Sequence, residues 1–183
     1  MSTALTSGVI DKTVVINPNA LVCKEQATIR GDVVIESRTI THPTVTIIAE
    51  KGPIRIGESN LIEEYVTIIN RSDEPMIIGN YNLFEVGSYS ESLSIGDNNV
   101  LEYRSRVGPR CFLTNGCIIG ALCNLDVDET LKENTVIYGP DCKRRIALEK
   151  PAQQNFQLDF LRKIMPNYQR LVQTAKPENQ STS

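Results

Sequence analysis

The stretch 95–137, IGDNNVLEYRSRVGPRCFLTNGCIIGALCNLDVDETLKENTVI, places a large aliphatic residue at every sixth position. A small or compact residue, such as Cys111 or Cys117, follows most of them four positions later. This unbroken period is typical of a hexapeptide β-helix, in which branched side chains fill the interior of each coil. The aliphatic series is Ile95, Leu101, Val107, Leu113, Ile119, Leu125, Leu131 and Ile137.

An eight-residue motif extends this repeat upstream. IGESNLIE at 56–63, IGNYNLFE at 78–85 and IGDNNVLE at 95–102 share one pattern, and their starts are 22 and 17 residues apart. Three hexads make one triangular coil, so residues about 18 apart stack on each other. We therefore expect Asn60, Asn82 and Asn99 to form an internal amide ladder, in which each side chain pairs with the next.

Because strand side chains alternate, the residue before each interior aliphatic points outward. On one face of the predicted prism all of these residues are aliphatic, whereas the last coils of the other two faces carry mainly polar residues such as Ser94, Arg106 and Asn124. An apolar stripe of this length needs a cover, which is either the C-terminal segment or another protein. The stripe is Leu21, Ile40, Leu61, Leu83, Val100, Ile118 and Val136.

The C-terminal segment predicts an amphipathic helix over about 154–174, because its apolar residues recur at spacings of three and four. Pro166 is expected to kink or divide that helix after Met165. The sequence thus predicts an all-β solenoid of about seven triangular coils with a helix packed along one face. Its predicted parts are an N-terminal extension (1–13), the β-helix (14–142), a linker and helix (143–176) and a disordered tail (177–183).

Composition and charge restrict the function classes. The chain has 183 residues, and its N-terminus lacks the basic and apolar regions of a secretory signal. We expect a cytoplasmic protein without membrane insertion, with free thiols at its 5 cysteines.

The charge is distributed unevenly along the chain. Residues 1–142 hold 11 basic and 19 acidic residues, whereas residues 143–183 hold 8 basic and 3 acidic residues. The acidic charge of residues 1–142 argues against nucleic-acid binding by this part of the chain. The basic C-terminal segment is expected to lie either on this acidic part or on an acidic partner.

Few residues offer catalytic chemistry. The single histidine, His42, excludes a three-histidine zinc site within one chain, and we interpret it as a surface or corner residue rather than a catalytic base. Cys111, Cys117 and Cys123 turn to different faces, so they suit corners better than a metal. Arg30-Gly31-Asp32 is interpreted as a corner in which Arg30 and Asp32 form a salt bridge. We predict no catalytic residue, cofactor or metal.

Three glutamates close the repeated octads and form a separate candidate surface. Glu63, Glu85 and Glu102 are expected to stack on the outside about 5 Å apart, where like charges repel. They form either a solvated edge or a ledge for a basic partner or for the basic tail.

Several segments closely resemble the dynactin subunit 6 family. They are IRGDVVI, IIAEKGPIRIGESNLIEE, PMIIGNYNLFEVGSYS, GDNNVLE, GCIIGALCNL, ENTVIYGPDCKRR and FQLDFLRKIMPNY, in family order and over about residues 14–170. The resemblance implies a left-handed β-helix without catalysis. It also implies partners, namely dynactin subunit 5, dynactin subunit 4 and the actin-related protein at the pointed end of the dynactin filament, with cytoplasmic dynein and its cargo adaptors as indirect partners.

The alternative is a hexapeptide-repeat enzyme. Proteins with this repeat include acyltransferases, in which a histidine commonly serves as base, and carbonic-anhydrase-like homotrimers that bind zinc through three histidines. An acyltransferase would have to use His42, and a homotrimeric zinc site would need three copies of His42 on one axis. A non-enzymatic assembly subunit is therefore the favoured interpretation.

Overall fold

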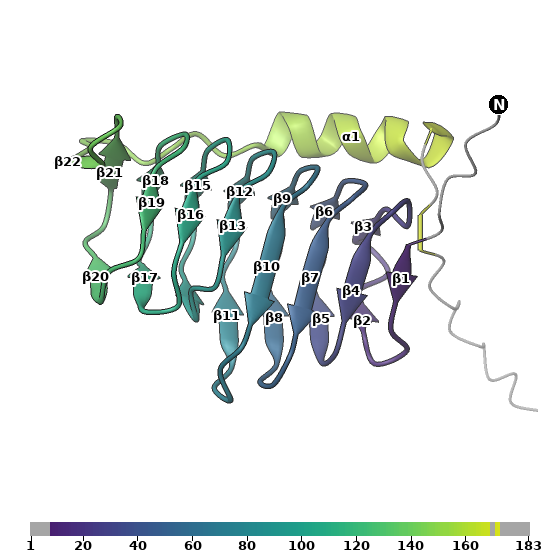
Figure 1. Cartoon of the computed structure of the whole chain (residues 1–183). Coiled ribbons are helices and arrows are strands. Elements are labelled where there is room, and N and C mark those ends of the chain that lie inside the picture. Colours follow the sequence, from purple (N-terminus) through teal and green to yellow (C-terminus); the bar gives the residue numbers. More distant parts are fainter. Residues whose placement is uncertain (1–7, 169–170, 173–183) are drawn as a thin grey trace, which may run out of the picture.

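The chain winds into a left-handed parallel β-helix whose three sheets form the sides of a prism (Figure 1). The computed structural model describes residues 8–168 and 171–172. Each coil contributes one short strand to each sheet, so strands three apart in the sequence pair in parallel. This confirms the predicted solenoid of about seven triangular coils.

The first sheet contains seven strands and has a mainly polar outer face. They are β1 (Val9–Ile10), β4 (Thr28–Arg30), β7 (Thr46–Ala49), β10 (Thr67–Asn70), β13 (Tyr89–Ser90), β16 (Arg106–Val107) and β19 (Asn124–Leu125).

The second sheet also contains seven strands. They are β2 (Val15–Ile16), β5 (Val33–Ile35), β8 (Ile54–Ile56), β11 (Met76–Ile78), β14 (Ser94–Ile95), β17 (Cys111–Leu113) and β20 (Glu129–Leu131).

The third sheet contains eight strands, of which the last is antiparallel. They are β3 (Leu21–Val22), β6 (Ile40–Thr41), β9 (Leu61–Ile62), β12 (Leu83–Phe84), β15 (Val100–Leu101), β18 (Ile118–Ile119), β21 (Thr135–Tyr138) and β22 (Lys143–Ile146).

The six-residue period sets the core. Every aliphatic residue of the series from Ile95 to Ile137 is buried in one cluster inside the prism. The outward residues of the third sheet pair in the predicted register, from Leu21 opposite Ile40 to Ile118 opposite Val136. Spacing alone therefore predicted both the interior and one outer column.

The amide ladder forms, but most of its bonds run to the backbone. Asn82 Oδ1 accepts from the backbone N–H of Asn99, and Asn60 Oδ1 accepts from that of Asn82, each at 2.9 Å. One direct amide pair is present, in which Asn99 Nδ2 donates to Asn82 Oδ1 at 3.0 Å. The expectation that each side chain pairs with the next was therefore wrong for Asn60, whose Nδ2 donates to backbone carbonyls.

Both boundaries of the β-helix differ from the predicted ones. Strand β1 lies within the expected N-terminal extension and pairs with β4, so the solenoid begins before residue 14. Strand β22 lies within the expected linker and pairs antiparallel with β21. The basic segment that begins at Lys143 is thus part of the third sheet, because the last coil offers it an unpaired strand edge.

One helix, α1 (Asn155–Tyr168), follows the solenoid and lies along the third sheet (Figure 1). It ends before the predicted Thr174, and Leu171 instead forms an isolated bridge with Cys23. Pro166 lies inside the last turn of one helix and does not divide it. The predicted disordered tail, 177–183, lies outside the described residues.

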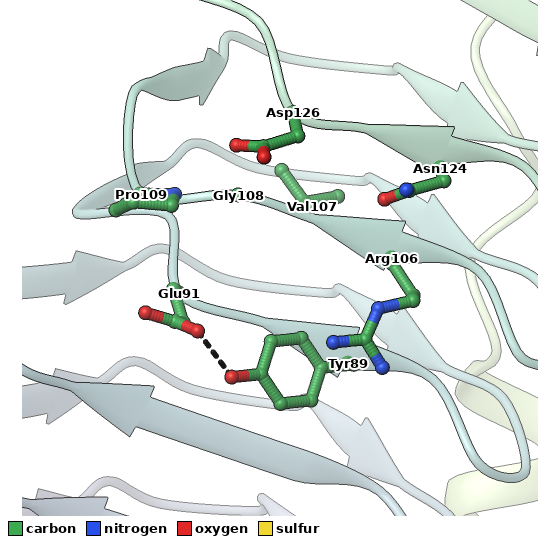
Figure 2. Close-up of a pocket in the computed structure, with 8 residues that line it drawn as sticks. All are labelled: Tyr89, Glu91, Arg106, Val107, Gly108, Pro109, Asn124 and Asp126. Carbon is green, nitrogen blue, oxygen red and sulfur yellow. Dashed lines mark hydrogen bonds between the residues drawn. The ribbon is translucent and has the colours of Figure 1, made fainter.

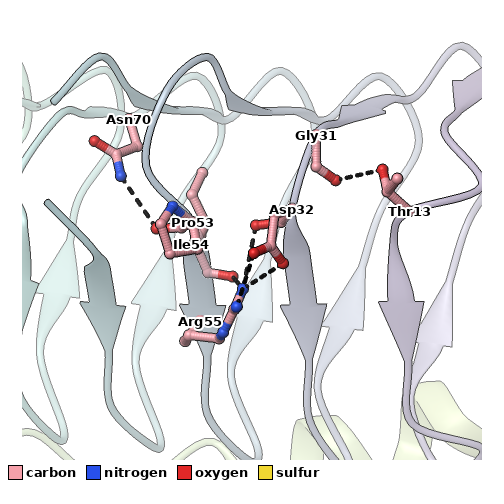
Figure 3. Close-up of polar contacts among 7 residues, drawn as sticks. All are labelled: Thr13, Gly31, Asp32, Pro53, Ile54, Arg55 and Asn70. Carbon is pink, nitrogen blue, oxygen red and sulfur yellow. Dashed lines mark hydrogen bonds and ion pairs between the residues drawn. The ribbon is translucent and has the colours of Figure 1, made fainter. Parts of the chain in front are cut away.

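The corner at Arg30-Gly31-Asp32 uses a different salt bridge from the expected one. Asp32 binds Arg55 in the next coil through two hydrogen bonds of 2.8 and 2.9 Å (Figure 3). Arg55 holds the pKa of the Asp32 carboxyl below its ordinary value through these bonds. Gly31 accepts a hydrogen bond from Thr13 Oγ1, so the corner ties three coils together.

Candidate interaction surfaces

The third sheet and α1 form a second apolar cluster, outside the prism. Leu61 and Leu83 belong to it and pack with Leu158 and Met165 of the helix. These four side chains are buried, which is the expected result when an amphipathic helix covers an aliphatic sheet face. The cluster also contains Cys23 and Ile40, with Leu21, Val100, Leu161 and Leu171 partly buried at its margin.

The helix covers only part of the predicted stripe. Val100 is half-buried at the edge of the cluster, whereas Ile118 is half-buried outside it. Val136 is buried in β21 beside the antiparallel strand β22. A partner at Ile118 stays a prediction. The five residues of the stripe from the third coil onward lie in one column but have different covers, and they are Leu61, Leu83, Val100, Ile118 and Val136.

Polar contacts set the position of α1 along the prism. Gln153 donates to Asn98 at 3.0 Å just before the helix, and Asp159 forms an exposed 3.1 Å ion pair with Arg38. Arg162 donates to the backbone carbonyl of Asn19. The helix thus runs from the fifth coil back to the first, and exposed pairs of this kind orient it more than they stabilise it.

Both ends of the third sheet are closed by the segment that follows the solenoid. Strand β22 pairs with β21 at one end. At the other end Leu171 bridges Cys23, and the N–H of Val172 donates to the carbonyl of Val22 at 2.8 Å. In the other two sheets, β1 and β2 are the first strands and β19 and β20 the last, among the residues that the structure describes. Those four strands offer backbone groups to a neighbour.

The three candidate ledge glutamates form hydrogen bonds to the backbone. Glu63 accepts from the N–H of Val86 at 3.1 Å, and Glu85 accepts from that of Tyr103 at 2.9 Å. Glu102 repeats the bond one coil later, with the N–H of Ala121. Each half-buried carboxylate thus fastens the next turn, and burial raises the pKa of Glu63. Sequence reasoning missed this role, and a contact with a basic partner stays a prediction.

His42 has the surroundings of a structural residue. Its Nδ1 lies 2.8 Å from Glu64 Oε1, and its side chain is 15% exposed. Its Nε2 is buried and has no hydrogen-bond partner within residues 8–168 and 171–172. The interpretation as a corner residue agrees with its position beside Pro43, but it is less exposed than a surface residue.

All five cysteines are free thiols. Burial raises the pKa of Cys111 and of Cys123 to about 11, and it also raises that of Cys117. Thiols with such values stay protonated near neutral pH and are poor nucleophiles and metal ligands. Over the described part of the chain, no group of three or more His, Cys, Asp or Glu side chains has the geometry to hold a metal ion.

A polar hollow of about 170 Å³ lies on the outer face of the first sheet (Figure 2). The Arg106 guanidinium lies over the Tyr89 ring, 4.0 Å from its centroid. Glu91 accepts from the Tyr89 hydroxyl and from Arg71, and Asp126 lies at the opposite rim. Tyr89, Glu91 and Arg71 are thus bonded to one another, which suits a rigid surface better than a reaction centre.

Comparison with known proteins identifies the family. No protein-family model matches the chain. A dynactin subunit 6 of Xenopus tropicalis is 52% identical over 172 residues, which cover 88% of this chain and 85% of the relative. A dynactin subunit 6 of Danio rerio is 51% identical over 177 residues, with 90% of each chain covered. The chain belongs to the dynactin subunit 6 family.

A solved structure supports the fold of this family member. A Bacillus cereus protein assigned as an acetyltransferase superposes with a TM-score of 0.65 over 82% of this chain and 86% of that one, at 18% identity. At that identity the likeness concerns the β-helix, because one fold hosts many functions. The described part of the chain contains no helix with the length and apolar character that a membrane span requires.

The second sheet gives this family member a mixed outer face. Ile77 lines a shallow hollow of about 240 Å³ on it with Val34 and Arg55. The outward column is Val15, Val34, Arg55, Ile77, Ser94, Phe112 and Thr130. The last coils of this face carry the polar residues Ser94 and Thr130, as predicted, whereas three of its first four coils carry an aliphatic residue.

Proposed function

We propose that this chain is a non-catalytic assembly subunit of dynactin that pairs with dynactin subunit 5. Membership of the dynactin subunit 6 family carries the proposal, since relatives about half identical over most of the chain bear that name. With dynactin subunit 4 and an actin-related protein, the pair would cap the pointed end of the filament. There it would help cytoplasmic dynein engage cargo adaptors in the cytoplasm.

The surface supports an assembly role. Within the described residues, two of the three sheets end in strands whose backbone groups can pair with a strand of a neighbour. The second sheet also presents Val15 and Ile77, which are 58% and 49% exposed. Exposed strand ends and exposed aliphatic side chains are costly in a lone subunit and useful in a complex.

The enzymatic alternative has less support. The fold neighbour is assigned as an acetyltransferase, but likeness at 18% identity does not carry chemistry to this chain. His42 is the single histidine, and its Nδ1 is engaged by Glu64. The buried thiols have raised pKa values, which disfavours them as nucleophiles.

Co-expression tests the proposal directly. The tagged full chain should co-purify with dynactin subunit 5, and the pair should then bind subunit 4 with the actin-related protein. A homotrimer of three 20.4 kDa chains that ignores subunit 5 would contradict it. Acetyl-coenzyme A turnover that His42→Ala abolishes would favour the enzyme instead.

A further inference from the structure

The outer side of α1 carries two exposed aromatic side chains. Phe156 is 93% exposed and Phe160 is 60% exposed, although both belong to a helix whose other side is buried. With 3.6 residues per turn, Phe156, Phe160 and Lys163 lie within about 60° of one another around the helix axis. We call these three residues the outer ridge. Leu158 and Met165 lie on the opposite side of the helix and face the solenoid.

The outer ridge continues toward the end of the solenoid. Ile146, the last residue of β22, and Leu148, in the segment that joins β22 to α1, are both exposed. That segment runs along the same edge of the prism (Figure 1). Burial of an apolar side chain stabilises a protein, and an exposed phenylalanine on a helix does not contribute this free energy in the isolated chain. Several such side chains along one edge mark a surface that a partner covers.

The charges beside the outer ridge are mainly positive. Arg145, Lys150 and Lys163 form no ion pair within the described residues, and one acidic residue, Glu149, is also unpaired there, whereas Asp159 is paired with Arg38. A partner that covers the ridge must therefore bring apolar side chains to Phe156 and Phe160 and acidic groups to its margins.

We propose that the outer ridge binds an acidic amphipathic helix of a partner protein. A single row of side chains on α1 fits between the rows of a second helix, as ridges pack into grooves. Glutamate or aspartate beside the apolar row of the partner would then face Lys163 and Lys150. The inference deepens the proposed assembly role and rests on it, since it states the chemistry of one partner segment.

Two other occupants fit less well. A second copy docked ridge to ridge would bring only Phe156, Phe160 and Lys163, because the one acidic residue of α1, Asp159, is already paired with Arg38. No acidic group would then face Lys163. A membrane would need a broad apolar helix face. The broad face of α1, with Leu158 and Met165, is already buried against the third sheet.

A designed peptide tests the proposal on the full chain. The probe is a fluorescein-labelled 18-residue helix with leucine at every third or fourth position and glutamate beside each leucine, and binding is read by fluorescence anisotropy. The double substitution Phe156→Ala with Phe160→Ala should weaken binding at least about tenfold, because exposed aromatic anchors dominate such interfaces. The matched control, Tyr65→Ala with Leu122→Ala, removes two exposed side chains elsewhere and should change binding less than about twofold.

Charge reversal tests the acidic part. Lys163→Glu should weaken binding of the acidic peptide and strengthen that of a version with lysine in place of glutamate. Equal binding of a scrambled peptide, or equal loss in the matched control, would overturn the proposal. So would a dimer in sedimentation that the phenylalanine substitutions dissolve, or ridge-dependent binding to phosphatidylserine vesicles without binding to the peptide.

The two proposals fail separately. If the wild-type chain co-purifies with dynactin subunit 5 but does not bind the peptide, the assembly role stands and the outer ridge inference is wrong. If it binds the peptide through Phe156 and Phe160 but never joins subunit 5, the ridge binds acidic helices and the dynactin role is wrong.

Discussion

The side-chain oxygen of Asn82 accepts a hydrogen bond of 2.9 Å from the backbone N–H of Asn99 in the next coil. It accepts a second bond from the Asn99 amide, and Asn82 Nδ2 donates to the carbonyl of Gly96. Asn82 and Asn99 are buried, whereas Gly96 is half-buried. One asparagine therefore provides partners for three polar groups, of which the two on Asn99 are in the interior.

Replacement of Asn82 should destabilise the solenoid strongly. Asn82→Ala leaves the N–H of Asn99 and the carbonyl of Gly96 without partners, so we expect the free energy of unfolding to fall by about 2–4 kcal/mol. Urea denaturation followed by circular dichroism measures it. Asn124→Ala, on the exposed face of the first sheet, is the matched control and should change stability by less than about 0.5 kcal/mol. Equal losses in the two variants would show that the ladder does not stabilise the coils.

The two sides of α1 should respond differently to truncation. Leu158 is 1% exposed against the third sheet, so Leu158→Ala should lower the free energy of unfolding by about 2–4 kcal/mol and speed proteolysis near α1. Phe156→Ala removes a larger side chain from the exposed side and should have an effect below about 0.5 kcal/mol. If Phe156→Ala were the more damaging, the helix would bury its other side in solution.

Much of the architecture is readable from the sequence because a β-helix is locally periodic. Each coil contacts its neighbours about 18 residues away, so one period predicts the core, the register and the column from Leu21 to Val136. The helix that covers the third sheet was predictable as well. Its apolar residues recur at helical spacing, and the sheet offers an aliphatic face on which they can be buried.

The ends and the polar contacts of the solenoid were not predictable in this way. Strands β1 and β22 are short, and their pairing depends on an edge that exists only after the coils have stacked. The N–H of Val86 donates to the carboxylate of Glu63, 23 residues earlier. This bond depends on the geometry of a turn, which the spacing of residues in the sequence does not reveal. The pattern of Phe156 and Phe160, four residues apart and off the buried side, was a signal that the sequence did contain.

Close approach of the coils predicts the effect of a substitution at Gly79. A Cβ atom there would lie 2.3 Å from Asp97 Oδ1 and 2.7 Å from the backbone carbonyl of Gly96. Gly79→Ala should therefore separate two coils and lower the free energy of unfolding by about 2 kcal/mol or more, measured by urea denaturation. Gly139→Ala meets no atom within 4 Å but has a φ of 72°, so its cost should be about 1 kcal/mol. The reverse order would show that the coils are not in close contact at Gly79.

Buried thiols predict a loss of stability at alkaline pH. Burial raises the pKa of Cys111 to about 11 from an ordinary value of 9.0, so the unfolded chain releases this proton at lower pH than the folded chain. The contribution of the Cys111 thiol to the free energy of unfolding is therefore fully present below pH 9.0, and it is lost as the pH rises to about 11.

Lysines and tyrosines also titrate in this pH range. The comparison of wild type with Cys111→Ala separates the contribution of Cys111 from theirs. The substitution costs packing at every pH, but the difference in the free energy of unfolding between the two proteins should shrink between pH 8 and pH 10.5. Urea denaturation at both values measures it under reducing conditions. A difference that stays constant would mean that the Cys111 thiol ionises as readily in the folded chain as in the unfolded one.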